Sequence, residues 1–512
     1  MNYNRIYQET YDALDNMYNT GMENREGQEN LMLNVCQAFE KNENVIVEAQ
    51  VGIGKSLGYL IPGVIISRIT NKPLIVASST IQLTEQLSND IKKVENILNI
   101  DIECIIGKGA ANYPCFKKIH AKLKSEELNS ALDIATQGLT KQEVDNFSFD
   151  WNEINADRCI HEKCIHNKGC SFLKMRNLMV KGNEYIRLKG YKPKVIIVNQ
   201  NLLLQHYKNK ELGKNGIICD DPCLIVIDEV HNLEENQRSV YTTSVNSLNC
   251  IKTLRKSINK YSGSKYYLKC VNDLQNWFDN QLNHIKSCKF DELNRESTNA
   301  RAFIENNNGN KLKEIIEGLG EIKEKLEFSN LGVFNHYTSS NESELEEIIN
   351  IINALKIIEE NNGDFVVWSE MVSKNQIKIS YCPSKTSEIL METLFNGDNT
   401  VACFSATITN DTNEKNGYSY IIESIGFKGF YENVEKNEFP YDKSRLYIPS
   451  KLPNYKNRDI EYYKEVANHI YNLSKHCNGG TMALFTSKED ILFVADELKK
   501  NEYSKSPLYR WR

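Results

Sequence analysis

Residues 48–56, EAQVGIGKS, constrain the fold of this chain more than any other segment. The three residues before the loop proper, 45–47 (VIV), form a short apolar run that predicts a buried strand. The run LGYLIPGVII that follows, with Pro62 inside it, predicts a helix. A strand, a glycine-rich turn, a Lys-Ser pair and a helix, in that order, are the context that a phosphate-binding loop requires. The segment therefore predicts a nucleotide-binding site.

The residues of this loop have distinct expected roles. Gly52 and Gly54 let backbone N–H groups approach the phosphates of ATP, and the start of the helix adds partial positive charge. Lys55 is expected to reach the β- and γ-phosphates, and the Ser56 hydroxyl to ligate Mg²⁺. The common pattern has a glycine where this chain has Ala49. A helix-capping glycine turn is therefore the alternative interpretation.

A second segment, residues 224–233 (LIVIDEVHNL), completes the pattern. It reads as an apolar strand that ends in two carboxylates. Asp228 at the strand end can hold Mg²⁺ through water, and Glu229 can act as the base for the attacking water. His231 lies where the state of the γ-phosphate could be sensed. Together the two segments predict an ATPase of the α/β class, with an open parallel sheet and ligands at the carboxyl ends of its strands.

Charge and hydropathy limit the partners of the chain. Its 512 residues carry a formal net charge of −6, so any contact with DNA must come from local basic patches. The N-terminus is polar, and the longest apolar runs, such as residues 60–66, are too short to span a bilayer. We therefore expect a cytoplasmic protein with no membrane partner.

Four of the 14 cysteines lie within residues 115–170, between the two ATP-binding segments. In a reducing compartment, clustered cysteines point to a metal site or to catalysis. Four thiolates in one insertion suit a [4Fe–4S] cluster. The four are Cys115, Cys159, Cys164 and Cys170.

Two other interpretations of the cysteines stay open. His161 and His166 are interleaved with the four and could join two of them around zinc. The chain has no short C-x2-C pair in this region, which weighs against zinc. We interpret the other ten cysteines as ordinary buried core residues. They are Cys36, Cys104, Cys219, Cys223, Cys250, Cys270, Cys288, Cys382, Cys403 and Cys477.

The cysteine-bearing insertion is also basic. Residues 105–125 contain five lysines, among them Lys108, and no acidic residue, and residues 163–192 contain eight Lys or Arg against one Glu. A cluster of cations is often only a solvated face. Next to aromatic residues such as Tyr113, Phe116 and Phe172, it also supplies charge for phosphates and rings for bases. We therefore expect this surface to bind single-stranded DNA.

The GKS and DEVH motifs together resemble the DEAD/DEAH-like helicases of superfamily two. Further motifs of that family appear in the expected order. Arg25 and Gln28, in REGQENLM, resemble the upstream motif that recognises adenine. Residues 74–87, LIVASSTIQLTEQL, resemble the segment that touches the nucleic-acid backbone, which implies a contact from Thr80.

Later motifs extend the resemblance. VACFSATIT resembles the motif that couples hydrolysis to strand movement, which implies that role for Ser405 and Thr407. Residues 481–491, TMALFTSKEDI, resemble the first strand of a second motor domain. The sequences around the four cysteines, KGAANYPC and DRCIHEKCIHNKGCSFLKMR, resemble the iron–sulfur domain of the DinG/XPD-type DNA helicases. VNQNLLL also resembles a segment of that family, with Gln200 in place of its histidine.

The resemblance implies an α/β fold with a RecA-like parallel-sheet motor domain, two inserted domains and an incomplete second RecA-like domain. The inserted domains are an iron–sulfur domain and a helical arch domain, and helical apolar spacing at 311–326 and 343–360 agrees with the second. The expected boundaries are 1–103, 191–235 and 381–412 for the first motor domain, 104–190 for the cluster domain, 236–380 for the arch, and 413–512 for the second motor domain.

The two ends of the chain carry their own expectations. The motor core starts near residue 1, so we expect no nuclease domain before it. We find no Gln-x-x-Gly-Arg-x-x-Arg motif, whose arginines reach the γ-phosphate in the family. An arginine finger is typically worth about 10³ to 10⁵ in rate. We therefore expect a C-terminally truncated helicase that is a poor ATPase, which a second polypeptide could complete.

The resulting hypothesis is an ATP-dependent 5′→3′ DNA helicase that uses ATP, Mg²⁺ and a [4Fe–4S] cluster. Its direction and its DNA partners, which are single-stranded, forked and R-loop DNA handled during repair, come from the resemblance alone. One alternative is a non-catalytic DNA-binding remnant that carries the cluster. Another is a zinc-containing nucleic-acid module, which iron analysis would distinguish.

Overall fold

The protein is described from a computed structural model. The structure describes residues 3–23, 25–144, 147–157, 164–260, 265–288, 301–304, 309–331, 339–360, 362–409, 417–434, 445–449, 452–453, 458–477 and 481–500. The chain divides into two compact units, residues 1–436 and 437–512. Among the described helices, none combines the length and the apolar character that crossing a bilayer would take.

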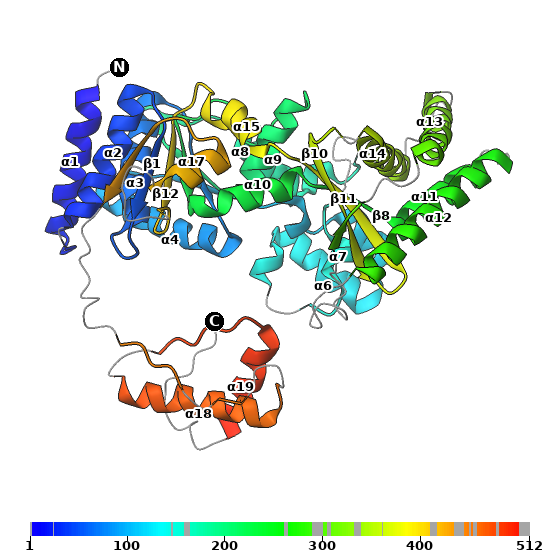
Figure 1. Cartoon of the computed structure of the whole chain (residues 1–512). Coiled ribbons are helices and arrows are strands. Elements are labelled where there is room, and N and C mark those ends of the chain that lie inside the picture. The colour runs from blue at the N-terminus through cyan, green and yellow to red at the C-terminus, as the bar shows by residue number, and fades with distance from the viewer. Residues whose placement is uncertain are drawn as a thin grey trace. The chain divides into compact units, whose positions relative to one another are not determined.

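A seven-stranded parallel sheet organises the first unit (Figure 1). Its strand order is β13-β1-β12-β7-β2-β6-β3. The strands are β1 (Val45–Ala49), β2 (Leu74–Ser78), β3 (Glu103–Gly107), β6 (Lys194–Asn199), β7 (Leu224–Asp228), β12 (Val401–Ser405) and β13 (Phe430–Val434). The predicted strands at 45–47, 195–198 and 224–227 are confirmed. Their apolar runs are almost wholly buried because helices cover both faces of the sheet.

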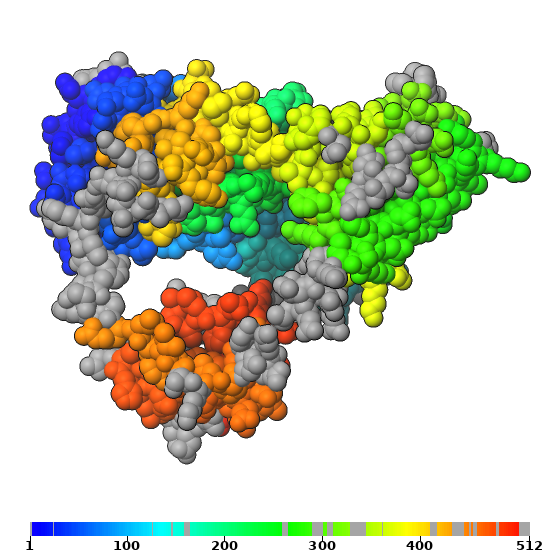
Figure 2. All heavy atoms as spheres, viewed as in Figure 1, coloured from blue at the N-terminus to red at the C-terminus, as the bar shows by residue number. Residues whose placement is uncertain are grey.

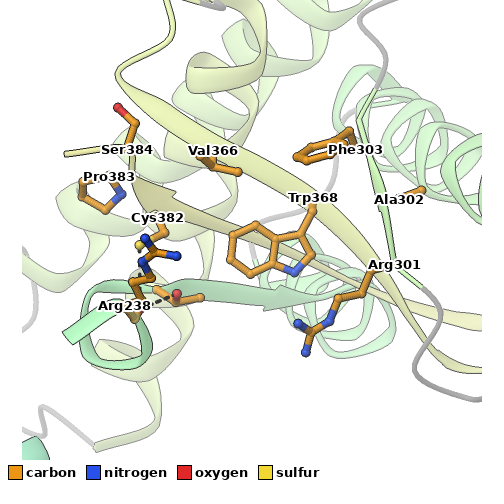
Figure 3. Close-up of a pocket in the computed structure, with 10 residues that line it drawn as sticks. Arg238, Arg301, Ala302, Phe303, Val366, Trp368, Cys382, Pro383 and Ser384 are labelled. Atoms are coloured by element: carbon orange, nitrogen blue, oxygen red, sulfur yellow. Dashed lines mark hydrogen bonds between the residues drawn. The ribbon is translucent and has the colours of Figure 1, made fainter. Parts of the chain in front are cut away.

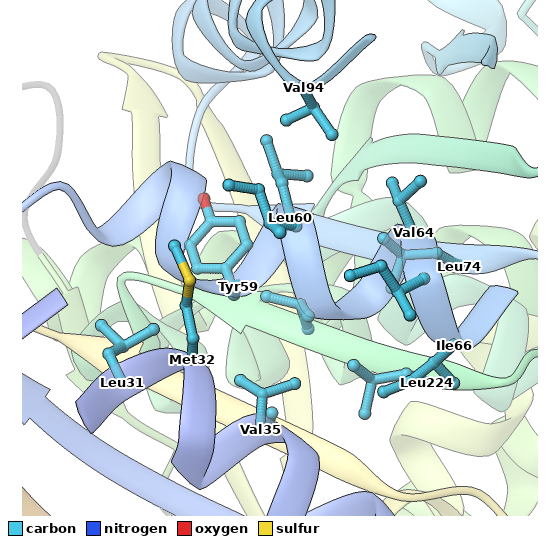
Figure 4. Close-up of a cluster of buried hydrophobic side chains, with 14 of the residues drawn as sticks. Leu31, Met32, Val35, Tyr59, Leu60, Val64, Ile66, Leu74, Val94 and Leu224 are labelled. Carbon is cyan, nitrogen blue, oxygen red and sulfur yellow. The ribbon is translucent and has the colours of Figure 1, made fainter. Parts of the chain in front are cut away.

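Alternate residues of each strand pack against different helices. On one face, the core joins the strands to α1 (Tyr3–Asn19), α2 (Glu26–Lys41), α3 (Lys55–Thr70) and α4 (Ile81–Leu98). Figure 4 shows part of this core, to which α2 contributes Leu31, Met32 and Val35 and α3 contributes Tyr59. On the other face lie α9 (Gln200–Glu211), α10 (Leu233–Tyr241), α15 (Thr386–Leu390) and α17 (Ser419–Ile425). The predicted helix with Pro62 inside it is confirmed as α3.

The expected end of the first motor domain at residue 412 is wrong. Strand β13 pairs with β1 in parallel, from Val45 opposite Phe430 to Ala49 opposite Val434. Segments far apart in the sequence therefore lie side by side, as the orange and blue surfaces in Figure 2 show. Strand β13, FYENV, is short and contains Glu432 and Asn433, and it completes the sheet edge next to the phosphate loop.

Asn44, directly before β1, joins three parts of this sheet. Its buried Nδ2 donates to the carbonyl oxygens of Phe395 and Lys428, each at 2.8 Å. Its Oδ1 accepts from the backbone N–H of Val401 at 2.9 Å. One side chain thus satisfies backbone groups at the starts of β12 and β13 and at the end of the helical segment 391–395.

The first insertion follows β3, which itself belongs to the motor sheet because it pairs with β6. The predicted boundary at 104 therefore falls inside a strand. The α-helices and strands described in the insertion are α5 (Phe116–Lys122), α6 (Ser125–Gln137), α7 (Trp151–Ile154), α8 (Ser171–Val180) and the hairpin β4 (Glu184–Ile186) with β5 (Gly190–Lys192). A small core around Ile119 and Trp151 holds α5, α6 and α7 together.

The second insertion, here called the arch region (residues 243–383), is not only helical. Its helices are α11 (Ser247–Lys260), α12 (Lys265–Ser287), α13 (Gly309–Leu331) and α14 (Ser339–Glu360). The last two confirm the expected helical segments. A four-stranded antiparallel sheet accompanies them, in the order β8 (Thr243–Asn246), β11 (Gln376–Pro383), β10 (Phe365–Ser373) and β9 (Arg301–Phe303).

The second unit contains two described helices, α18 (Ile460–His476) and α19 (Lys488–Lys500). They pack through Tyr463, Val494 and Leu498. The strand expected near 481–486 is not formed, because none of the described residues of this unit pairs with that segment as a neighbouring strand.

His206 of α9 predicts a pH dependence of stability. Its ring is 3% exposed, and its Nδ1 accepts the backbone N–H groups of Ile217 and Ile218, so that nitrogen carries no proton in the folded state. Burial lowers the pKa of His206 to about 4. As the pH falls, the histidine of the unfolded chain takes up a proton near pH 6.5, whereas the buried ring of the folded chain does not until about pH 4. The contribution of His206 to the free energy of unfolding should therefore be constant above about pH 6.5 and decrease by up to roughly 3 kcal/mol as the pH approaches 4.

Urea unfolding at several pH values measures this effect. The matched control is His206→Gln, which lacks the titrating ring and should lose less free energy of unfolding over the same pH range. Parallel losses in both proteins would show that His206 is not the responsible group.

Candidate active site

The phosphate loop connects the end of β1 to the start of α3. Gly52 and Gly54 adopt positive φ angles of 90° and 94°, which favour glycine. A Cβ atom added at Gly54 would lie 2.1 Å from the side-chain nitrogen of Gln28. The residues expected to cradle phosphates thus form the tight turn that the sequence predicts.

Arg25 and Gln28 hold this loop from outside. The Arg25 guanidinium donates to the carbonyl oxygen of Gly52 at 2.5 Å, and Gln28 Nε2 donates to that of Gly54 at 2.9 Å. Both side chains therefore fix the loop backbone. Their expected contact with adenine stays a prediction.

The two acidic residues at the end of β7 face the same loop. Asp228 is 8% exposed, and Glu229 adopts a left-handed conformation with φ 55° and ψ 51°. Such a conformation is costly for a residue with a side chain and is concentrated at functional sites. Lys55 Nζ lies 3.8 Å from Glu229 Oε1, so the loop lysine and the expected base meet at the carboxyl ends of β1 and β7.

The environment of Asp228 suits a divalent cation. Burial, followed by the neighbouring charge of Glu229, raises the pKa of Asp228 to about 6. Its buried Oδ1 has no hydrogen-bond partner among the described residues. A cation or its water would satisfy this oxygen and favour the ionised carboxylate. Asp228 therefore fits Mg²⁺, and Ser56, at the second position of α3, is the hydroxyl expected to join it.

The Ser-Ala-Thr sequence at residues 405–407, here called the SAT segment, lies at the end of β12 and contacts the carboxylate of Glu229. His231 Nδ1 lies 2.6 Å from Ser405 Oγ, and Ser405 Oγ donates to Glu229 Oε2 at 3.4 Å. Asn232 Nδ2 faces His231 Nε2 at 2.9 Å. With the amide of Asn232 donating, one consistent tautomer places the ring proton on Nδ1, which donates to Ser405. The backbone N–H of Thr407 also donates to Ser405 Oγ, at 3.3 Å.

Gln200 is a supporting residue whose role the sequence does not reveal. Its fully buried Nε2 donates to the carbonyl oxygens of Asp228 at 2.8 Å and Glu229 at 3.1 Å. Its Oε1 accepts from Asn236 Nδ2 at 2.7 Å. Gln200 thus holds the backbone that carries both acidic residues. Its position in VNQNLLL, directly after a predicted strand, was the available signal.

One small pocket is lined by three of the four predicted cluster cysteines, Cys115, Cys164 and Cys170. Burial, and then the neighbouring Cys115 and Cys164, raise the pKa of Cys170. Cys159 and His161 lie outside the described residues. Within the described part of the chain, no three His, Cys, Asp or Glu side chains are arranged to hold a metal ion.

The expected DNA contacts of Lys108 and Tyr113 are corrected by the structure. Lys108 is 6% exposed, and its Nζ binds Glu85 and Thr140 at 2.9 and 3.0 Å. Tyr113 is 2% exposed and packs against Phe172 with ring centres 5.6 Å apart. These residues stabilise the insertion from within. Thr80 is exposed and caps α4 by accepting from the backbone N–H of Leu83, and its DNA contact stays a prediction.

One protein family and several known proteins are similar in sequence to this chain. The DEAD/DEAH box helicase family matches residues 27–149, which include the phosphate loop. The chain is similar to "3'-5' exonuclease DinG" of Bacillus subtilis (strain 168), with 23% identity over 538 residues that cover 94% of this chain and 56% of the relative. It is also similar to "ATP-dependent DNA helicase DinG" of Photobacterium profundum, with 28% identity over 251 residues that cover 44% and 34% of the two chains. This chain thus corresponds to only part of the length of these two relatives.

Two solved structures are similar over most of this chain. "XPD_Helicase" has a TM-score of 0.44 at 17% identity and covers 93% of this chain and 74% of its own. Xpd4 of S. tokodaii has a TM-score of 0.46 at 13% identity, with the same two coverages.

Proposed function

We propose that this chain, which belongs to the DinG/XPD-type helicases of superfamily two, hydrolyses ATP at the phosphate loop and uses the energy to move along single-stranded DNA. One observation carries the proposal. Lys55, Glu229 and Ser405, from three distant segments, meet at the carboxyl ends of β1, β7 and β12. A parallel sheet collects ligands at this edge.

The roles of the residues follow from their contacts. Lys55 and the first turn of α3 bind the phosphates of ATP, whose oxygens compete with Glu229 for the lysine ammonium group. The Glu229 carboxylate then accepts the proton of the attacking water. Asp228 and Ser56 would hold Mg²⁺, which neutralises charge on the phosphates when bound.

The hydrogen-bonded chain from His231 through Ser405 to Glu229 connects the hydrolytic centre to the SAT segment. Loss of the γ-phosphate changes the charge next to Glu229 and therefore the partner that Ser405 can bind. Thr407 shares the Ser405 hydroxyl through its backbone N–H. We propose that these contacts transmit the state of the nucleotide to the DNA.

The 5′→3′ polarity and the role in repair or R-loop removal rest on the resemblance to the family. Forks with a single 5′ or a single 3′ overhang test the polarity directly. Preferential unwinding from the 5′ overhang is the expected result, and preferential unwinding from the 3′ overhang would overturn it.

ATP hydrolysis is the first test of the proposal. The chain should hydrolyse ATP faster with single-stranded DNA, and Lys55→Ala should lower that rate at least about 100-fold because a charge aimed at the phosphates is lost. Lys41→Ala, an exposed lysine at the end of α2, is the matched control and should leave the rate unchanged. Hydrolysis that Lys55→Ala leaves intact would contradict the proposal.

A [4Fe–4S] cluster held by Cys115, Cys159, Cys164 and Cys170 is the second part of the proposal. Support comes from the three described cysteines around one pocket and from the suitability of thiolates for iron. The anaerobically purified chain should contain about four irons and absorb visible light. Cys170→Ser should lose both signals, whereas Cys477→Ser, at an exposed cysteine of the second unit, should keep them. Zinc without iron in the purified chain would overturn this assignment.

A further inference from the structure

The antiparallel sheet of the arch region has two unlike faces. On β11, Ile377, Ile379 and Tyr381 belong to the core that packs against α11–α14. Because side chains alternate along a strand, Val366 and Trp368 of β10 lie on the opposite face from Val367, which packs against that core. Helices α11–α14 therefore pack against one face of this sheet.

Aromatic side chains gather on the other face. Trp368 of β10 pairs in register with Phe303 of β9, and Phe303 is 74% exposed. Val366, two residues before Trp368, is 41% exposed. The Nε1 atom of Trp368 is buried and has no hydrogen-bond partner in the part of the chain that the structure describes. This face thus offers two aromatic rings.

Two arginines flank these rings in a pocket of about 440 Å³ (Figure 3). Arg301 projects from β9, and Arg238 from the last turn of α10. Each guanidinium contacts one carboxylate, with Arg238 at 2.6 Å from Glu234 and Arg301 at 3.5 Å from Glu370. Both side chains are 64% exposed, and a single carboxylate cannot engage all five donors of a guanidinium.

Rings for stacking and cations for phosphates are what a single-strand site combines. We propose that this pocket, here called the arch pocket, binds one nucleotide of a single-stranded DNA. Its base stacks on Phe303 and Trp368, and its phosphates contact Arg301 and Arg238. The inference rests on the proposed function, because it assigns a contact to the strand on which the motor moves. An open antiparallel sheet with aromatic side chains is also how several folds bind unpaired bases.

The arch pocket is connected to the ATP site by one helix. Arg238 lies two residues after Asn236 on α10, and Asn236 donates to Gln200, which holds the carbonyl oxygens of Asp228 and Glu229. The carbonyl of Arg238 also accepts from Thr242 and from the thiol of Cys382 on β11. A DNA strand bound in this pocket therefore contacts α10, the helix that follows the DEVH motif.

Binding of a fluorescein-labelled oligo(dT) to the full chain, measured by anisotropy without ATP, tests the inference. The double variant Phe303→Ala with Arg301→Ala should weaken binding about 10- to 100-fold. The slope of the logarithm of the binding constant against the logarithm of the salt concentration should become smaller in magnitude by about one, because one fewer counterion is released. The buried Glu370 keeps Lys378 as a partner at 2.9 Å, so this double variant should fold. Trp368→Phe, which removes the indole donor and replaces the double ring with a single one, is a second variant and should weaken binding less than the double variant does.

The matched control is Tyr266→Ala with Arg255→Ala, which removes an exposed ring and an exposed cation from helices of the arch region. It should bind oligo(dT) like the parent chain. Equal losses in both double variants, or no loss in either, would overturn the inference. Crosslinking of an iodouracil oligonucleotide to peptides that contain Phe303 or Trp368 is expected, and crosslinks exclusively elsewhere would also overturn it.

Free dTMP distinguishes a strand site from a mononucleotide site. It should compete with oligo(dT) only weakly, and competition at equal affinity would overturn the assignment to a strand. Failure of the proposed function has a different signature, which is the absence of Lys55-dependent ATP hydrolysis while oligo(dT) binding and its loss in the pocket variant persist.

Discussion

Glu229→Gln is expected to lower the rate of ATP hydrolysis by about 10²- to 10⁴-fold, because the amide cannot accept the proton of the attacking water. Glutamine has nearly the same shape as glutamate and keeps an oxygen for the Ser405 hydroxyl. Binding of MgATP should therefore persist, since Lys55 and the glycine loop are unchanged. Single-turnover hydrolysis and fluorescent-nucleotide binding measure the two quantities separately.

Glu235→Gln provides the control for this prediction. Glu235 lies on the exposed side of α10 and does not face the phosphate loop, so its substitution removes the same charge away from the ATP site. Its rate of hydrolysis should stay close to that of the parent chain. If Glu229→Gln hydrolysed ATP at the parent rate, or lost nucleotide binding in proportion to the rate, Glu229 would not be the general base.

Asn44→Ala is expected to lower the free energy of unfolding of the first unit by roughly 3–6 kcal/mol. The substitution leaves the carbonyls of Phe395 and Lys428 and the N–H of Val401 without their side-chain partner. Each buried polar group left unpaired costs about 1–3 kcal/mol. Chemical denaturation followed by tryptophan fluorescence measures the change.

The neighbouring exposed residue Glu43 offers a control at the same turn. Glu43→Ala should change the free energy of unfolding by less than about 0.5 kcal/mol. Asn44→Asp should also be destabilising, because it keeps the acceptor for Val401 but removes both amide donors. A stable Asn44→Ala chain would show that water replaces these contacts at little cost.

The parts of the site that the sequence predicts are those with local signals. The phosphate loop and the DEVH segment each follow a buried apolar strand, so the residues next to them can be placed at a sheet edge. The resemblance to a family adds the SAT segment, and the contact of Ser405 with Glu229 agrees with that placement. Helices α13 and α14 were predictable from apolar spacing alone.

Other features depend on partners that are distant in the sequence. Strand β13 is a short edge strand, and its role appears only when β1 pairs with it. Gln200 and Asn44 act on backbone groups, which leave no mark on the sequence of their partners. The burial of Lys108 could not be predicted because it depends on the salt bridge with Glu85.

The sheet of the arch region did leave a signal that helical spacing elsewhere obscured. Residues 377–381, IKISY, alternate between apolar and polar side chains, which is typical of a half-buried strand. A short turn separates them from another run of strand-forming residues, 365–373, so a hairpin was predictable. Its pairing with β8 and β9, which lie far away in the sequence, was not.

The position of β1 between β12 and β13 has a consequence for how the protein is made. Asn44 and the carbonyl of Lys428 are 384 residues apart, and ribosomes add about 5–20 residues per second. The strand that carries the phosphate loop therefore waits roughly 20–80 s for both of its neighbours during synthesis. Over that interval its two unpaired edges are open to mispairing with other nascent chains. The inserted regions, whose own cores close over shorter distances, can fold first and leave the nucleotide site as the last part of the first unit to assemble.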